Sequence, residues 1–187
     1  MRSIAALLCL LAVVAAALAA DDAPDPELIA LLKEAAGEAD SFADEFDAQV
    51  WLTDMSRRLA RQVEDPEERI TILRHVHYEA TRADLAPELV LAVIDVESNF
   101  DRFAISHVGA RGLMQVMPFW VQEIGRPEDN LMRIGTNLRY GCTILKYYID
   151  MEDGDLVRAL GRYNGSLGSR RYPNLVLDKL RLKWFRV

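Results

Sequence analysis

One glutamate, Glu97, stands at the end of a helical pattern in a position suited to acid chemistry. Three apolar residues, Val90, Val93 and Ile94, precede it at the spacings of a single helix face. A carboxyl group that emerges from such a face loses part of its hydration, which disfavours the charged form and raises the pKa. A raised pKa is what a general acid near neutral pH requires. Taken alone, however, a glutamate at a helix end is usually a solvated or ion-paired residue.

Two polar segments further along the chain contain glycines and polar side chains of kinds that are found beside bound ligands. Residues 106–118 read Ser-His-Val-Gly-Ala-Arg-Gly-Leu-Met-Gln-Val-Met-Pro, and residues 162–165 read Arg-Tyr-Asn-Gly. Gly109 and Gly112 allow tight turns or a close approach of the backbone to a ligand. The amide of Gln115 can both donate and accept hydrogen bonds. Some apolar residues nearby could instead be ordinary core, namely Met114, Met117, Phe119 and Trp120.

In this order and spacing, the Glu-Ser pair at 97–98 and the two polar segments resemble the soluble lytic transglycosylase family. The family pattern is a Glu-Ser pair, then Gly-Leu-Met-Gln-x-Met-Pro, then Ala-Tyr-Asn. The resemblance covers about residues 85–180, roughly half of the chain. It implies a goose-type-lysozyme-like fold. It also implies cleavage of the β-1,4 bond between N-acetylmuramic acid and N-acetylglucosamine in peptidoglycan, with a 1,6-anhydromuramoyl product and no cofactor.

The resemblance also assigns roles to individual residues. Glu97 matches the family's single catalytic acid and base. Ser106 matches a serine that hydrogen-bonds the sugar or the region of the catalytic carboxylate. The remaining matches are the groove-lining residues Gln115 and Met117, the pair Tyr163 and Asn164 beside the glutamate, and Asn137 and Gly141 on a helix behind the groove.

The third block departs from the family pattern. Arg162 stands where the family usually has alanine, and 165–168 (Gly-Ser-Leu-Gly) replaces a shorter small-residue run. A long cation beside Tyr163 could change the reach of the substrate or bind an acidic stem peptide. Substrate preference is therefore less well indicated than the reaction.

Other reactions remain open at this point. A lysozyme-like hydrolase needs a second carboxylate, for which Asp95 and Asp101 are candidates by proximity in sequence. Asp95 faces about 200° away from Glu97 around a helix, whereas the direction of Asp101 cannot be deduced. A glycan-binding protein without activity is a further alternative, but such a protein would not need Glu97. Metal-dependent hydrolysis is poorly supported, since His75 and His77 point to different faces of a helix.

The first residues have the layout of a secretory signal. A basic start at Arg2 is followed by the apolar run 4–20 and an Ala-x-Ala site that ends at Ala19. We expect cleavage there rather than anchoring, because the run is short for a membrane span. Lipidation of Cys9 is disfavoured, since Leu8 precedes it where a small residue is needed. We therefore expect an exported, periplasmic protein with no membrane span once the signal is removed.

Composition narrows the possible partners. The chain has 187 residues and a formal charge of −7, which becomes −8 once Arg2 is lost with the signal. An acidic protein is a poor partner for nucleic acid, because phosphate binding depends on Lys and Arg. Cys142 would be the single cysteine left, so no internal disulfide is possible, and its helical surroundings indicate a buried core residue. Peptidoglycan glycan strands are the expected partner, and protein partners cannot be deduced.

The hydrophobic periodicity predicts an all-α fold: a lysozyme-like helical domain with an N-terminal helical extension. A cap and proline at Asp65-Pro66 begin one helix, Pro87 begins the next, and helical patterns continue near 113–124, 130–151 and 155–164. We divide the chain into a signal (1–19), a leader and helical extension (20–84) and a catalytic domain (85–187). The extension is expected to pack on the catalytic domain through the apolar residues Phe42, Phe46 and Trp51.

Overall fold

The computed structural model describes residues 29–32, 35 and 41–185, so the predicted signal and the start of the leader lie outside the described residues. Within these residues the chain is helical, and two isolated bridges, Ile105 to Arg111 and Arg111 to Val116, are its only β-pairing. The all-α prediction is confirmed. The named helices are α3 (Glu45–Leu59), α4 (Pro66–Arg82), α5 (Pro87–Glu97), α6 (Phe119–Ile124), α7 (Ile134–Met151), α8 (Leu156–Tyr163), α9 (Arg171–Lys179) and the π-helical η1 (Leu180–Trp184).

Helix starts follow the signals in the sequence. The side chain of Asp65 accepts a hydrogen bond from the Glu67 N–H, and Pro66 occupies the first turn of α4. Pro87 begins α5 in the same way. Asp155 caps α8 by accepting from two backbone N–H groups of its first turn. These helix starts were predicted within one or two residues.

The segment 113–124 is helical only in its second half, so the helix predicted near these residues is shorter than expected. Gly112 and Gln115 have φ angles of +72° and +48°, which no α-helix accommodates. Gln115 and Gly112 are also joined by a turn hydrogen bond between the Gln115 N–H and the Gly112 carbonyl. The chain therefore forms an irregular loop over 98–118, and α6 begins only at Phe119.

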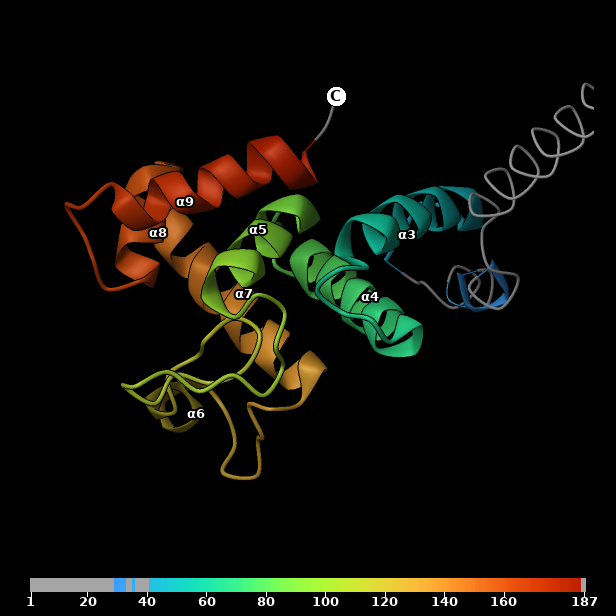
Figure 1. The fold of residues 1–187 in the computed structure, drawn as a ribbon. Helices are drawn as coiled ribbons and strands as arrows, with labels where there is room; N and C mark the ends of the chain where they lie inside the picture. The colour runs from blue at the N-terminus through green and yellow to red at the C-terminus, as the bar shows by residue number, and fades with distance from the viewer. Residues whose placement is uncertain (1–28, 33–34, 36–40, 186–187) are drawn as a thin grey trace, which may run out of the picture.

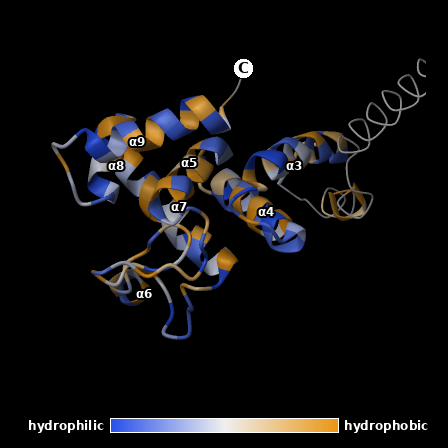
Figure 2. Ribbon diagram, in the orientation of Figure 1, coloured by the Kyte–Doolittle hydropathy of each residue, from blue (hydrophilic) through white to orange (hydrophobic). Residues whose placement is uncertain are grey.

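Helix α5 lies at the centre of the fold and carries Glu97 at its end. Every residue of 89–95 is buried, and α5 packs against α4, α9 and η1, as its position between them in Figure 1 shows. Orange, hydrophobic segments occur where these helices approach one another (Figure 2). Helix α7 packs against α4 and α8 and buries Cys142, whose thiol pKa is raised by that burial. The core around α5 thus fixes the position of the glutamate.

Helix α3 packs on α4 and touches η1. Phe42 stacks on His77, with ring centroids 3.5 Å apart, and the Trp51 indole N–H donates to Glu88 Oε1 at 2.8 Å. The prediction that Phe46 is a third apolar anchor is wrong, because 73 % of its surface is exposed. It points outward because the buried face of α3 passes through Leu52, Met55 and Leu59 instead, leaving Phe46 on the opposite side.

The domain boundary at residue 84 falls between α4 and α5 and stays a prediction. None of the helices in the described part of the chain is both long enough and apolar enough to cross a membrane.

Candidate active site

Glu97 opens onto a cleft of about 340 Å³ at the C-terminal end of α5. The irregular loop supplies one side of this cleft, and α7 and α8 supply the other. The cleft brings together all of the predicted site residues, which are Glu97, Ser106, Gln115, Met117, Tyr163 and Asn164. His107 and Trp120 also line it, although neither was predicted. Trp120 was considered as ordinary core, but only part of its surface is buried.

The Glu97 carboxyl is electrostatically suited to proton transfer. Burial disfavours its charge and raises its pKa from 4.5 to about 7, while a hydrogen bond from the Tyr172 hydroxyl acts in the opposite direction. That hydroxyl donates to Glu97 Oε1 at 2.6 Å. Near neutral pH the acid and carboxylate forms are therefore both accessible.

Tyr172 was missed by the sequence analysis. It lies in the first turn of α9, 75 residues after Glu97. Its own pKa is raised well above 10 by burial and by the nearby Glu97 charge, so its hydroxyl keeps its proton and acts as a donor. A signal was present, since Tyr172, Val176 and Lys179 share one helix face, but this segment was not recognised as a helix.

Tyr163 lines the cleft, yet its hydroxyl does not hold Glu97. It donates instead to the Met114 carbonyl at 2.8 Å. Burial is the main cause of its raised pKa. Tyr163 thereby ties the end of α8 to the loop that forms the other side of the cleft, next to Asn164, which caps α8.

The loop is held in shape by its own hydrogen bonds. Ser106 Oγ accepts from the Ala110 N–H at 3.0 Å. The amide nitrogen of Gln115 donates to the carbonyls of Ala104 and Gly112, at 3.2 and 2.9 Å. The carbonyl oxygen of Gln115 is therefore the part of that side chain suited to a ligand donor.

Asn137 fastens this loop to α7 from behind. Its side-chain oxygen accepts from the Met114 N–H at 2.8 Å. Its nitrogen donates to the carbonyls of Arg111 and Leu131, at 2.8 and 2.9 Å. Only 1 % of Asn137 is exposed, so these three bonds satisfy a buried amide. Asn137 and the loop can approach because Gly112 has no Cβ, which would lie 2.6 Å from the Leu131 oxygen.

Gly141 allows a second close contact between α7 and the loop. A Cβ at this position would lie 2.7 Å from Met114 Cβ, well inside contact distance. From the end of α5, Ser98 Oγ donates to the Leu113 carbonyl at 2.8 Å. The loop residues 111–114 are therefore held between α7 and the helix that carries Glu97.

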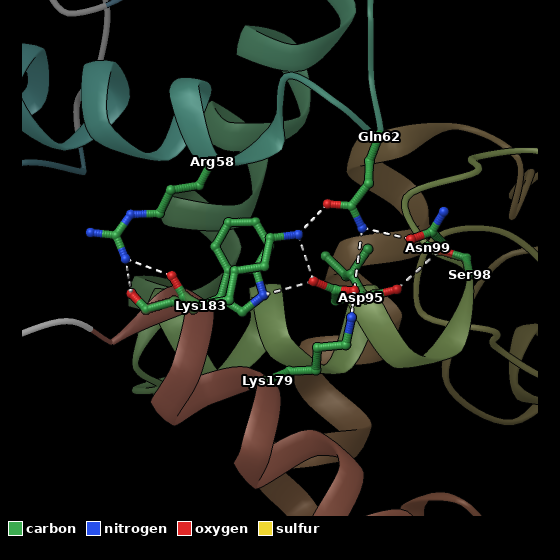
Figure 3. A network of polar contacts seen from close by, with 9 residues as sticks. Arg58, Gln62, Asp95, Ser98, Asn99, Lys179 and Lys183 are labelled. Atoms are coloured by element: carbon green, nitrogen blue, oxygen red, sulfur yellow. Dashed lines mark hydrogen bonds and ion pairs between the residues drawn. The ribbon is translucent and has the colours of Figure 1, made fainter.

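The two aspartates near Glu97 lie outside the cleft. Asp95 points away from it, as the helix geometry predicted, and is surrounded by Lys179, Lys183 and Gln62 (Figure 3). Asp101 is exposed and accepts a hydrogen bond from the Phe103 N–H at 2.8 Å. Among the residues that line the cleft, Glu97 is the one carboxyl group.

Arg162 is already paired with an acidic residue. Its Nε donates to Glu152, which also accepts from Arg158. Arg162 does not line the cleft beside Tyr163. A contact of Arg162 with the stem peptide was considered from the sequence, and this ion pair gives the cation a different partner.

Larger cavities lie elsewhere, among them two of about 740 and 730 Å³. The first is lined by residues around α6 and the second by α4 and the start of α7, and neither includes Glu97. Size alone therefore does not select the cleft at Glu97, which is the candidate site because it holds a buried carboxyl group with a raised pKa.

The range that matches a known protein family contains all of the cleft residues named above. The sequence pattern of the Transglycosylase SLT domain matches residues 75–175. The chain belongs to this family. A match over 88 residues, with 35% identity, relates it to the membrane-bound lytic murein transglycosylase F of Desulfosudis oleivorans, covering 45% of this chain and 19% of that protein. The transglycosylase of Enterobacteria phage PRD1 is 31% identical over 106 residues, which are 53% of this chain and 39% of the phage protein.

The SLT family member described here thus spans well under half the length of these two relatives. Among solved structures, lytic transglycosylase Slt of Pseudomonas aeruginosa aligns over 83% of this chain and 34% of its own, with 20% identity and a TM-score of 0.48. The 70 kDa soluble lytic transglycosylase of Escherichia coli aligns over 78% and 27%, with 22% identity and a TM-score of 0.42.

Proposed function

We propose that this protein is a peptidoglycan lytic transglycosylase. It cleaves the β-1,4 bond between N-acetylmuramic acid and N-acetylglucosamine and leaves a 1,6-anhydromuramoyl end. The observation that carries the proposal is the single carboxyl group of the cleft, Glu97, whose pKa burial raises to about 7. Both the matched family and its named relatives support this reaction class.

One carboxyl group can serve both halves of this reaction. In the acid form Glu97 donates its proton to the glycosidic oxygen, so the bond to the leaving sugar breaks. The substrate N-acetyl group stabilises the oxocarbenium-like carbon that results. The Glu97 carboxylate then takes the proton of the C6 hydroxyl while that oxygen closes the 1,6-anhydro ring. The proton lost in the first step is regained in the second, and no water is consumed.

The other cleft residues bind and orient the glycan in this proposal. Ser106, Gln115 and Asn164 offer polar groups to sugar hydroxyls and acetamido groups, and Met117 and Tyr163 offer apolar surface. Tyr172 stabilises Glu97 as a carboxylate between the two proton transfers.

A lysozyme-like hydrolase is the competing function. Such enzymes use two carboxyl groups roughly 5–10 Å apart across the scissile bond. Asp95 is engaged by two lysines, Asp101 is exposed and turned to its own backbone, and neither lines the cleft. The geometry therefore favours transglycosylation over hydrolysis.

The test is mass spectrometry of the soluble products released from purified peptidoglycan by the wild-type protein and by Glu97→Gln. We expect anhydro-ended muropeptides from the wild type and none from the variant. Reducing-ended products would mean hydrolysis. Glycan binding by both proteins without release would indicate a binding protein and overturn the proposal.

We further propose that the protein is exported to the periplasm and loses residues 1–19. The basic start, the apolar run and the Ala-x-Ala site support export. Sequencing the N-terminus of the protein from a periplasmic fraction tests this. A first residue of Ala20 is expected, whereas an intact N-terminus in the membrane fraction would mean an anchor.

A further inference from the structure

A second carboxylate on α5, Asp95, is buried in a polar network that the proposed reaction does not use. Its side chain has 0% exposure. Lys179 Nζ and Lys183 Nζ donate to it at 2.6 and 2.8 Å, and the Trp184 indole N–H at 3.1 Å. Gln62 adds a fourth donor at 3.2 Å. Burial alone would raise the pKa of Asp95, but the two lysines outweigh burial and lower it, so Asp95 stays charged.

Three of these four donors belong to the C-terminal segment α9–η1 (Figure 3). The same segment is held from α3, where Arg58 donates to the carbonyls of Lys183 and Trp184, at 2.6 and 3.3 Å. The Trp184 ring packs on Phe100 with centroids 5.5 Å apart and is 1 % exposed. Asp95 is thus the point on α5 to which the end of this segment is attached.

Helix α9 is bonded to α5 at two places. Tyr172 reaches Glu97 near the start of α9, and Lys179 reaches Asp95 at its end. Seven residues separate the two attachments, which is about 10 Å of helix. Val176 is buried between them with 0% exposure. Two attachments that far apart fix both the axial position and the rotation of α9, which one attachment could not.

We propose that Asp95 is a positioning residue: by anchoring Lys179, Lys183 and Trp184, it holds α9 where the Tyr172 hydroxyl meets Glu97. The effect of this positioning on catalysis rests on the proposed function. The positioning itself does not, because the contact between Tyr172 and Glu97 can be measured without substrate. Asp95, which faces away from the cleft, thereby influences Glu97 inside it.

The competing explanations predict opposite signs. If Asp95 acted on Glu97 only through its charge, its removal would stabilise the Glu97 carboxylate and lower the pKa of Glu97. If Asp95 positions α9, its removal weakens the hydrogen bond from Tyr172 and raises that pKa. Two titratable side chains on the neighbouring helices interact with Glu97, namely Tyr172 of α9 and Tyr163 of α8. Both keep their protons and stay neutral, because their pKa values are raised well above 10. The direction in which the pKa of Glu97 changes therefore distinguishes a positioning role of Asp95 from an effect of its charge.

The experiment is an NMR titration of Glu97 in the full chain labelled with ¹³C at the glutamate carboxyl, with Glu97→Gln to assign the signal. In Asp95→Asn we expect the pKa of Glu97 to rise by at least about half a unit, roughly a threefold gain in proton affinity. In the double variant with Tyr172→Phe, we expect no rise beyond that of Tyr172→Phe alone. Glu79→Gln is the matched control, since Glu79 of α4 is 2 % exposed and is paired with Arg82 of the same helix rather than with α9 or η1. It should lower stability without moving the titration.

An unchanged or lowered pKa in Asp95→Asn would overturn the proposal, as would an additive rise in the double variant. If Asp95→Asn does not fold, Trp184→Phe removes one neutral donor from Asp95 and keeps an aromatic ring. A smaller rise in that variant supports positioning, and an unmoved titration refutes it. A wild-type protein without activity on peptidoglycan whose Glu97 still titrates as expected would refute the proposed function alone.

Discussion

Replacing Tyr172 by phenylalanine should raise the pKa of Glu97 by about one unit. The Tyr172 hydroxyl donates to Glu97 Oε1 at 2.6 Å and is buried. It favours the carboxylate, opposing the burial that raises the pKa of Glu97 to about 7. A hydrogen bond to a charged group contributes about 1.5 kcal/mol at the lower end of its usual range. Since one pKa unit corresponds to 1.36 kcal/mol, its loss shifts the pKa from about 7 to about 8.

The assay is the pH dependence of kcat/KM for release of soluble fragments from peptidoglycan. In the proposed reaction Glu97 must begin protonated, so activity should fall as pH rises through its pKa. In Tyr172→Phe this basic limb should move upward by about one unit. Tyr163→Phe is the matched control: its hydroxyl bonds to the Met114 carbonyl rather than to Glu97. It should lower the rate without moving the limb. A basic limb that stays in place or moves downward in Tyr172→Phe would refute the reasoning.

Three further predictions concern stability. Because the pKa of Glu97 is raised from 4.5 to about 7 in the fold, its ionisation destabilises the protein as pH rises through that window. Urea denaturation should therefore show that Glu97→Gln has a free energy of unfolding about 1–3 kcal/mol higher than wild type above pH 7. At pH 4 the two proteins should be equally stable. Asn137→Ala leaves three backbone groups without partners and should lower the free energy of unfolding by about 2–4 kcal/mol; a loss below 1 kcal/mol would contradict the role of Asn137. Gly141→Ala places a methyl group against Met114 and should lower the melting temperature at a cost of about 1–3 kcal/mol, whereas an unchanged melting temperature would mean that the loop moves freely.

The sequence was most informative where local pattern determines structure. The position of Glu97 at the end of an apolar helix face, and the raised pKa this implies, followed from the spacing of Val90, Val93 and Ile94. The direction of Asp95 followed from helix geometry. Residues of both polar segments line one cleft together with Glu97, although Arg162 does not. The first two inferences needed only helical periodicity, whereas the grouping of the two segments with Glu97 was implied by the resemblance to the transglycosylase family.

The contacts that the sequence did not reveal join residues far apart in the chain. Tyr172 and Lys179 act on α5 across more than 70 residues, and no local pattern indicates which tyrosine reaches a given carboxylate. Arg162 finds Glu152 ten residues earlier, a pairing that depends on the turn between α7 and α8. Phe46 is apolar yet exposed, because the rotation of α3 on α4 is decided by the summed packing of its other residues.

In the proposed reaction one carboxyl group must act as both acid and base, roles that hydrolases divide between two carboxyl groups. Burial of Glu97 keeps its acid form accessible near neutral pH, but burial alone would also make it a weaker acid and leave the carboxylate formed by proton transfer unstable. The Tyr172 hydrogen bond has its largest effect at that moment, because it stabilises the charged form. If it were displaced by even an ångström, Glu97 would hold its proton too tightly. The position of α9, and hence the anchoring of its far end at Asp95, should therefore affect the rate of bond cleavage more than the affinity for glycan.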